Sequence, residues 1–254
     1  MRVAAVQHDI VWEDPEANFE RLAPKVAAAV ADGARLVVMA EMYSTGFSMD
    51  SDRVAEPPDG PSVGFLVELA AAHGVWVGAS VPVRDRSAAE LPVNRFVLAG
   101  PDGVAGTYDK IHPFSYGGEH EHYAAGADWL TVVADGVRVT PFVCYDLRFS
   151  DEFWAVAHDT DCYVVVANWP VARRAHWSAL LVARAIENQA YVIGVNRVGS
   201  GGGLDYAGDS VIVDPLGNVV ADAPAGQEAV LCAEVDPAEV ERVRSRYPFL
   251  HDRR

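Results

Sequence analysis

The sequence predicts an α/β fold in which two mixed sheets pack face to face and are covered by helices. Strand-like and helix-like segments alternate from the N-terminus, which favours parallel strands with helices packed on them. Several later strand-like segments are joined by short turns, which adds antiparallel pairs. Roughly a dozen such segments favour two sheets over one open sheet. No linker, low-complexity run or repeat interrupts the 254 residues, so we expect a single domain over residues 1–254.

Apolar periodicity and turn residues define the individual elements. Apolar, β-branched runs indicate buried strands, and apolar residues at helical spacing indicate helices packed against a sheet. Asp14 and Pro15 mark the start of the first helix, and Gly33 marks its end. Residues 44–60, 111–126 and 199–203 are predicted to be loops. The predicted strands are residues 3–6, 36–40, 75–81, 94–99, 104–109, 129–133, 137–143, 162–167, 191–195, 210–213, 219–221 and 229–235, and the predicted helices are residues 15–32, 61–73, 150–158, 172–189 and 237–246.

Composition and charge exclude several classes of protein. The net charge of −16 disfavours nucleic acid and anionic membrane surfaces as partners, although a local arginine can still bind an anionic substrate. No apolar run is long enough to span a membrane, and the first residues begin a strand pattern instead of a signal peptide. The three cysteines are few and widely spaced, which is typical of reduced thiols in a cytoplasmic protein.

Three chemically reactive residues each follow directly after an apolar strand. Glu41 follows residues 36–40, Lys110 follows residues 104–109, and Cys144 follows residues 137–143. Strand ends are where function collects in α/β folds, so we expect the three side chains to converge. A carboxylate can take the thiol proton, and a lysine can lower the thiol pKa and oppose the oxyanion of a tetrahedral intermediate. The backbone N–H of Tyr145 would be a second oxyanion donor.

The segments around these residues resemble the active-site motifs of the nitrilase superfamily of carbon–nitrogen hydrolases. They are M-A-E-M at 39–42, Y-D-K-I-H at 108–112 and V-C-Y-D-L-R-F at 143–149. Further similarity covers A-N-W-P at 167–170, R-A-I-E-N-Q at 184–189 and D-P-L-G at 214–217. The resemblance implies a four-layer α-β-β-α sandwich, a Glu-Lys-Cys triad without cofactor or metal, and a homodimer that associates through helices near the active site.

The resemblance also implies a second glutamate in the loop after the lysine. Glu119 and Glu121 compete for this role, and the family's spacing to a glycine at the next strand, here Gly126, selects Glu119. Within the superfamily the sequence is most similar to the omega-amidases, which hydrolyse the terminal amide of 2-oxoglutaramate. The resemblance therefore implies a hydrolase that converts a small carboxylate-bearing ω-amide to the acid and ammonia through a Cys144 thioester.

Substrate-binding residues are predicted from the chemistry of such a substrate. Arginine suits a planar carboxylate because it can bind in bidentate fashion, and Arg148, Arg173 and Arg174 are the available choices, of which we favour the first two. Ligand sites are largely apolar and aromatic, so Tyr43, Phe114 and Trp169 are predicted to line the pocket. Each of these side chains could instead be a surface or core residue.

Several alternatives remain open from the sequence. An N-carbamoyl amino acid amidohydrolase or another small aliphatic amidase would use the same triad, and a non-catalytic binding protein could share the fold. The Glu119-His120-Glu121-His122 cluster contains metal-ligand types but no established ligand spacing. His112 or His176 could serve Cys144 in a papain-like pair, although this leaves the glutamate and lysine unexplained.

Overall fold

A computed structural model describes residues 1–85 and 91–253 of the chain. Each main element forms where its residue pattern indicates, and the capping residues agree: the side chain of Asp14 accepts a hydrogen bond from the N–H of Ala17 at the start of α1. The strands are β1 Arg2–Gln7, β2 Leu36–Val38, β3 Trp76–Val83, β4 Val93–Gly100, β5 Gly103–Asp109, β6 Val132–Ala134, β7 Val137–Val143, β8 Cys162–Ala167, β9 Tyr191–Asn196, β10 Val198–Gly201, β11 Leu204–Ala207, β12 Val211–Val213, β13 Val219–Asp222 and β14 Ala229–Glu234. The α-helices are α1 Pro15–Ala31, α2 Ser51–Val54, α3 Pro61–His73, α4 Ser150–Ala155, α5 Arg174–Asn188 and α6 Pro237–Arg246.

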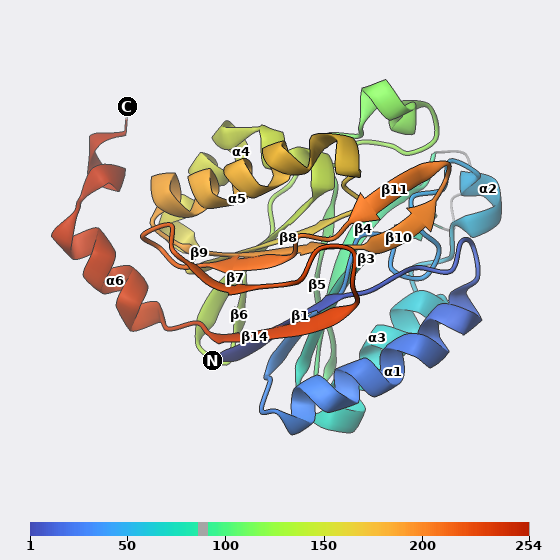
Figure 1. Cartoon of the computed structure of the whole chain (residues 1–254), viewed down its shortest axis with the longest axis horizontal. Coiled ribbons are helices and arrows are strands. Elements are labelled where there is room, and N and C mark those ends of the chain that lie inside the picture. Colours follow the sequence, from blue (N-terminus) through green and yellow to red (C-terminus); the bar gives the residue numbers. More distant parts are fainter. Residues whose placement is uncertain (86–90, 254) are drawn as a thin grey trace.

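Two mixed six-stranded sheets form the centre of the molecule (Figure 1). The first has the strand order β14-β1-β2-β3-β4-β5 and the second has the order β13-β12-β9-β8-β7-β6. In each sheet the middle strands are parallel and the outer ones antiparallel, as expected when crossover helices alternate with hairpins. The strands β2, β5, β7 and β8 end close together, and the chemically reactive residues follow these ends.

Helices cover the outer face of each sheet, so the layers run helix, sheet, sheet, helix (Figure 1). Helices α1 and α3 pack on the first sheet around a cluster that includes Leu22, Val26 and Leu66. Helices α4 and α5 cover the second sheet. A larger apolar cluster fills the space between the two sheets and joins strands of both, for example through Phe96 and Phe142. The predicted α-β-β-α sandwich of two mixed sheets is therefore confirmed.

Several predicted elements differ from the structure. The strand predicted over residues 36–40 ends at Val38, and the predicted loop 44–60 contains the short helix α2. Residues 199–203 were predicted to be a loop, but they belong to the hairpin of β10 and β11, with Gly201 and Leu204 as the innermost pair of its register. The helix predicted over residues 150–158 ends at Ala155, and residues 157–159 form a separate 3-10 turn. The predicted strand at 129–133 is shorter and lies at Val132–Ala134.

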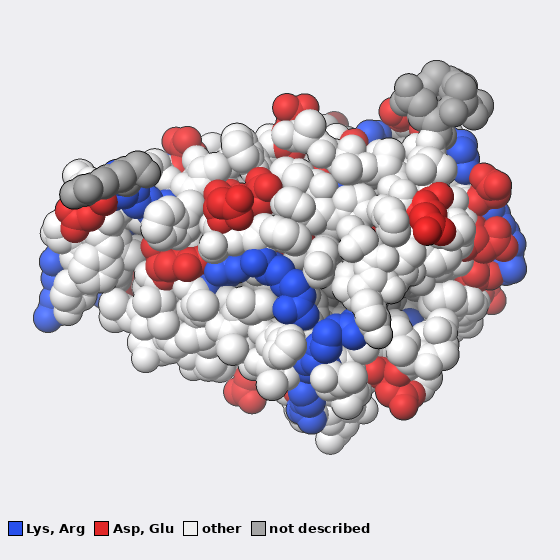
Figure 2. Space-filling model, turned by 90° about the horizontal axis from the view of Figure 1, so that it is seen from above, with Lys and Arg blue, Asp and Glu red and all other residues white. Residues whose placement is uncertain are grey.

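The surface mixes acidic and basic side chains. Figure 2 shows the face over α4 and α5, where charged groups of both signs are interspersed with broad uncharged areas. In the described part of the chain, no helix has the length and apolar character needed to cross a membrane.

Candidate active site

Cys144 lies on a sharp turn between strand β7 and the 3-10 helix η3 (Cys144–Arg148). Its backbone φ is +47°, a left-handed conformation that is rare for a residue with a side chain. Such strained positions persist where the surrounding structure fixes them, and they are common at reactive residues. Because N–H groups in the first turn of a helix have no intrahelical acceptor, the N–H of Tyr145 is free to bind another oxygen.

The carboxylate of Asp146 fixes this turn from inside. Its Oδ2 accepts hydrogen bonds from the N–H of Val143 (3.0 Å) and the hydroxyl of Tyr108 (2.8 Å), and its Oδ1 accepts one from the N–H of His112 (2.9 Å). The side chain is fully buried, and burial raises the pKa of Asp146 to about 6. Asp146 thus joins the nucleophile turn to the strand β5 and the segment that follows Lys110.

Glu41 is fully buried at the end of β2 and is held by residues of both sheets. Its Oε1 accepts hydrogen bonds from Nζ of Lys110 (2.9 Å) and Nδ2 of Asn94 (2.8 Å). Its Oε2 accepts the backbone N–H of Asn168 (2.8 Å), and Nδ2 of Asn168 donates to the backbone oxygen of Glu41 (2.6 Å). These contacts leave little freedom for the carboxylate to rotate.

Lys110 and Glu119 complete a buried charged cluster with Glu41. Nζ of Lys110 lies 2.8 and 3.0 Å from the two carboxylate oxygens of Glu119, and the ring of Phe47 is 5.3 Å from the ammonium. Burial alone would lower the pKa of Lys110, but the charges of Glu119 and Glu41 outweigh burial and raise it. Glu119 also accepts the N–H of Phe114 (2.5 Å). Lys110 therefore remains an ammonium between two carboxylates.

The thiol of Cys144 is not held as a thiolate. Burial, followed by the charge of Glu41, raises the pKa of Cys144 well above its ordinary value. Lys110 lowers this pKa, as predicted, but by less than the other groups raise it. Such a thiol becomes a nucleophile only when a base removes its proton, and Glu41 is a buried carboxylate whose charge acts on this thiol.

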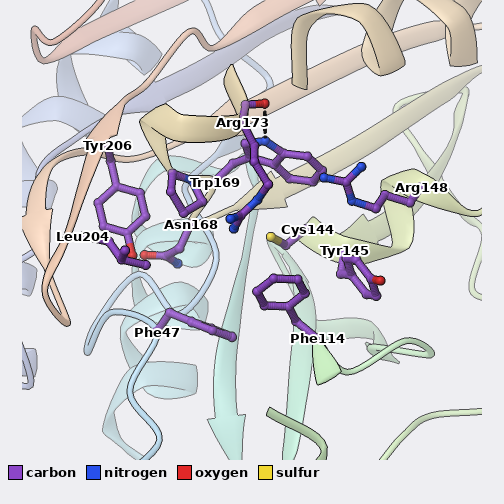
Figure 3. A pocket seen from close by; sticks show the side chains of 11 residues that line it. Phe47, Phe114, Cys144, Tyr145, Arg148, Asn168, Trp169, Arg173, Leu204 and Tyr206 are labelled. Carbon is purple, nitrogen blue, oxygen red and sulfur yellow. Dashed lines mark hydrogen bonds between the residues drawn. The ribbon is translucent and has the colours of Figure 1, made fainter. Parts of the chain in front are cut away.

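A pocket opens above Cys144, with aromatic walls and polar groups at its rim (Figure 3). Its empty volume, counted to include the open mouth, is about 390 Å³. It contains four of the predicted substrate-binding residues, and the further lining residues Phe47, Asn168, Leu204 and Tyr206 were not among those predicted. The pocket is lined by Phe47, Phe114, Cys144, Tyr145, Arg148, Asn168, Trp169, Pro170, Arg173, Leu204 and Tyr206.

Two arginines face this pocket without a carboxylate partner in the described part of the chain. The guanidinium of Arg148 stacks 4.7 Å from the ring of Trp169, and that of Arg173 lies 5.2 Å from the ring of Phe114. Arg174 differs, because it forms a bidentate ion pair with Asp209 (2.6 and 2.9 Å). Of the three arginines, only Arg148 and Arg173 are available to an anion in the pocket.

The prediction that Tyr43 lines the pocket is wrong. After β2 the chain turns at Met42, whose φ is +43°, and this turn sends the side chain of Tyr43 to the helix side of the first sheet. Its ring packs near Phe19 and Phe65, with centroids 6.1 and 6.2 Å away, and its hydroxyl donates to the backbone oxygen of Ser62 (2.6 Å). Tyr43 is a core residue.

The histidines predicted as alternative bases, and the cluster predicted as a possible metal site, make other contacts in the structure. His112 stacks on Phe149 and lies 2.8 Å from Glu152, and His176 contacts Arg148 (3.2 Å). Glu119 points into the site, whereas His120 and Glu121 are exposed. Among residues 1–85 and 91–253, no group of three or more His, Cys, Asp or Glu side chains is arranged to hold a metal ion.

Comparisons with known proteins show the family to which the chain belongs. The model of the carbon–nitrogen hydrolase family matches residues 2–245. The chain is 40% identical to "Omega-amidase YafV" of Yersinia enterocolitica, covering 99% of this chain and 96% of the relative. It is 33% identical to the 2-oxoglutaramate amidase of Bacillus subtilis, and the match covers 98% of this chain and 96% of the relative.

A solved structure is similarly close. It is a CN-hydrolase superfamily protein from Xanthomonas campestris with an arsenic adduct in its active site, and it is 38% identical to this chain. The two structures superpose with a TM-score of 0.93 over 100% of this chain and 97% of the other. The buried Glu41 and Lys110 and the partly buried Cys144 thus occur in a chain that belongs to the carbon–nitrogen hydrolase family.

Proposed function

We propose that the protein is an omega-amidase, which hydrolyses the terminal amide of a small ω-amide that carries a carboxylate, such as 2-oxoglutaramate. The observation that carries this proposal is the pocket itself, where two arginines without carboxylate partners in the described chain face the same cavity as Cys144. In a protein of net charge −16, such a pair is a local site for an anion. The names of the relatives from Yersinia enterocolitica and Bacillus subtilis support the same substrate class.

In the proposed first half-reaction, Cys144 attacks the amide carbonyl while Glu41 takes the thiol proton. Lys110 and the N–H of Tyr145 donate hydrogen bonds to the oxyanion of the tetrahedral intermediate. Glu41 then returns the proton to the nitrogen, the C–N bond breaks, and ammonia leaves a thioester on Cys144. The charge of Glu41 acts on the Cys144 thiol, and Glu41 lies in the same buried cluster as Lys110 (2.9 Å), which supports this role for the carboxylate.

In the second half-reaction, water attacks the thioester. Glu41 accepts a proton from this water, the C–S bond breaks, and the proton returns to the sulfur as the acid product leaves. Glu119 assists by holding Lys110 in place through two hydrogen bonds. No metal or cofactor takes part in the proposed cycle.

The substrate class can be tested by ammonia release from 2-oxoglutaramate, glutamine, an N-carbamoyl amino acid and a simple aliphatic amide. We expect the highest kcat/KM for 2-oxoglutaramate. A preference for the N-carbamoyl substrate, with release of carbon dioxide as well as ammonia, would overturn the assignment.

The arginines can be tested with a matched control. Because a hydrogen bond to a charged group contributes about 1.5–3 kcal/mol, Arg148→Gln and Arg173→Gln should each raise KM for 2-oxoglutaramate about tenfold or more. Arg174→Gln is the control, since Arg174 is paired with Asp209 and should leave KM within about twofold. Equal effects of all three substitutions would contradict a carboxylate site in the pocket.

We also propose that the protein works as a homodimer in the cytoplasm. Exposed apolar side chains on the helices α4 and α5, Trp154 and Ile186, support association through this face, and the three widely spaced cysteines are typical of a compartment that keeps thiols reduced. Light scattering of the wild type should give twice the chain mass, and Ile186→Glu should lower it. A wild-type protein that remains a monomer at micromolar concentration would contradict the dimer.

A further inference from the structure

The glycine-rich segment 199–203 is folded tightly against two large side chains. A Cβ atom on Gly201 would lie 2.6 Å from Nη1 of Arg197 and 2.9 Å from Cε3 of Trp12. A Cβ atom on Gly202 would lie 2.9 Å from Cη2 of Trp12, and this residue also has a positive φ of +57°. Glycine is therefore required here so that the hairpin of β10 and β11 can approach Trp12 and Arg197.

Arg197 connects the hairpin of β10 and β11 to the segment that follows strand β1 of the first sheet. Its side chain is fully buried, and its Nη2 donates to Oδ1 of Asp9 (2.8 Å) and to the backbone oxygens of Ile10 and Ser200 (3.1 Å each). The guanidinium carbon also lies 4.7 Å from the ring centroid of Tyr206. A buried arginine with this many acceptors holds its neighbours in one arrangement, so Tyr206 has a fixed place.

Tyr206 comes from β11 and lines the pocket above Cys144 (Figure 3). Its residue surface is only 4% exposed, yet within the described chain its hydroxyl has no hydrogen-bond partner. Burial raises the pKa of Tyr206 to about 12, so the hydroxyl keeps its proton at neutral pH and can donate it. Because this hydroxyl belongs to a residue that lines the pocket and has no hydrogen-bond partner in the described chain, it is available to a ligand group.

We propose that Tyr206 determines specificity by donating a hydrogen bond to the 2-oxo group of the substrate. This inference rests on the proposed function. In that function the reacting amide occupies Cys144 and the carboxylate occupies the arginines, so the 2-oxo oxygen is the one acceptor of a 2-oxoglutaramate-like molecule still without a partner. An ammonium at the same carbon, as in glutamine, would lie near the unpaired guanidinium groups and would be disfavoured.

The test compares two substrates that differ only in the 2-oxo group, 2-oxoglutaramate and glutaramate. We expect the wild type to prefer 2-oxoglutaramate in kcat/KM. Tyr206→Phe should lower kcat/KM for 2-oxoglutaramate about tenfold, the size of a lost hydrogen bond, and leave glutaramate within about twofold. Tyr163→Phe is the matched control, because its hydroxyl donates to the backbone oxygen of Phe153 in the core, and it should leave the substrate preference unchanged.

The outcomes separate this inference from the proposed function. If wild type hydrolyses neither substrate, the proposed function fails together with the inference. The wild type could hydrolyse 2-oxoglutaramate while Tyr206→Phe keeps the wild-type preference for this substrate or lowers kcat/KM equally for both substrates. In that case only the role of Tyr206 is overturned. Gly201→Ala gives a second readout: by displacing the hairpin it should also reduce the preference for the 2-oxo substrate, and an unchanged preference would count against the inference.

Discussion

Replacing Glu119 by glutamine tests whether this residue belongs to the catalytic cluster, and Glu121 supplies a matched control. Both residues lie in the 3-10 turn η2 (Glu119–Glu121). Glu119 is fully buried against Lys110, whereas the side chain of Glu121 is 71% exposed. Glu119→Gln keeps the shape of the side chain but removes its charge and one of its two acceptors.

The size of the effect follows from the hydrogen bonds of Lys110. Its ammonium contacts Glu119 at 2.8 and 3.0 Å and Glu41 at 2.9 Å. Losing one charge-assisted hydrogen bond costs about 2 kcal/mol. The ammonium then pairs more closely with Glu41, which is the proposed base, so we expect kcat to fall about 30-fold.

The assay is steady-state ammonia release from 2-oxoglutaramate by the wild type, Glu119→Gln and Glu121→Gln. Thermal melting of each protein shows that the folded state is retained. We expect Glu121→Gln to keep kcat within about twofold, because an exposed charge contributes little. A folded Glu119→Gln protein with wild-type kcat, or an equal loss of kcat in both variants, would show that Glu119 does not belong to the catalytic cluster.

Two further predictions concern stability, and urea unfolding measures both. Gly194→Ala in β9 should lower the free energy of unfolding by about 1–3 kcal/mol, because the added Cβ would lie 2.4 Å from Cδ1 of Leu181. Gly64→Ala in α3 meets nothing within 4 Å and should raise it by about 0.5–1 kcal/mol; shifts of the same sign would contradict this account. Burial lowers the pKa of His8 to about 4, below its ordinary 6.5, so the unfolded state binds an extra proton between these values and stability falls as the pH falls through them. From about pH 7.5 to about pH 4.5 the wild type should therefore lose about 2–3 kcal/mol more than His8→Gln, and parallel pH curves would contradict the assignment.

The sandwich and the positions of Glu41, Lys110 and Cys144 could be predicted because each depends on local sequence. An apolar run long enough for one strand, followed at once by a reactive residue, predicts Lys110 and Cys144 directly after β5 and β7, and it predicts Glu41 near the end of β2, which it follows by three positions. The layers follow from the alternation of such strands with helices. These features require no knowledge of contacts between distant segments.

The rest of the site depends on contacts that local sequence does not contain. Asn168 binds Glu41 across the two sheets, 127 positions away along the chain. Tyr206 reaches the pocket only because the glycines before it pack against Trp12 and Arg197. Tyr43 does not line the pocket, because the turn at Met42 directs its ring to the helix side of the first sheet.

The net direction of the thiol pKa also could not be predicted. Pairing Cys144 with Lys110 suggested a lowered value, because an opposite charge favours the thiolate. The outcome depends on burial and on the charge of Glu41, and both act in the other direction. A local pattern identifies the groups that interact, whereas their balance depends on packing.

The central claim is that Cys144 forms the acyl intermediate, and Cys144→Ala tests it most directly. Ammonia release from 2-oxoglutaramate is measured for this variant and for Cys232→Ala, a control thiol in strand β14 outside the pocket. We expect Cys144→Ala to lose on the order of 10⁴-fold or more in kcat, while Cys232→Ala keeps wild-type activity. A folded Cys144→Ala protein that hydrolyses the amide near the wild-type rate would contradict it.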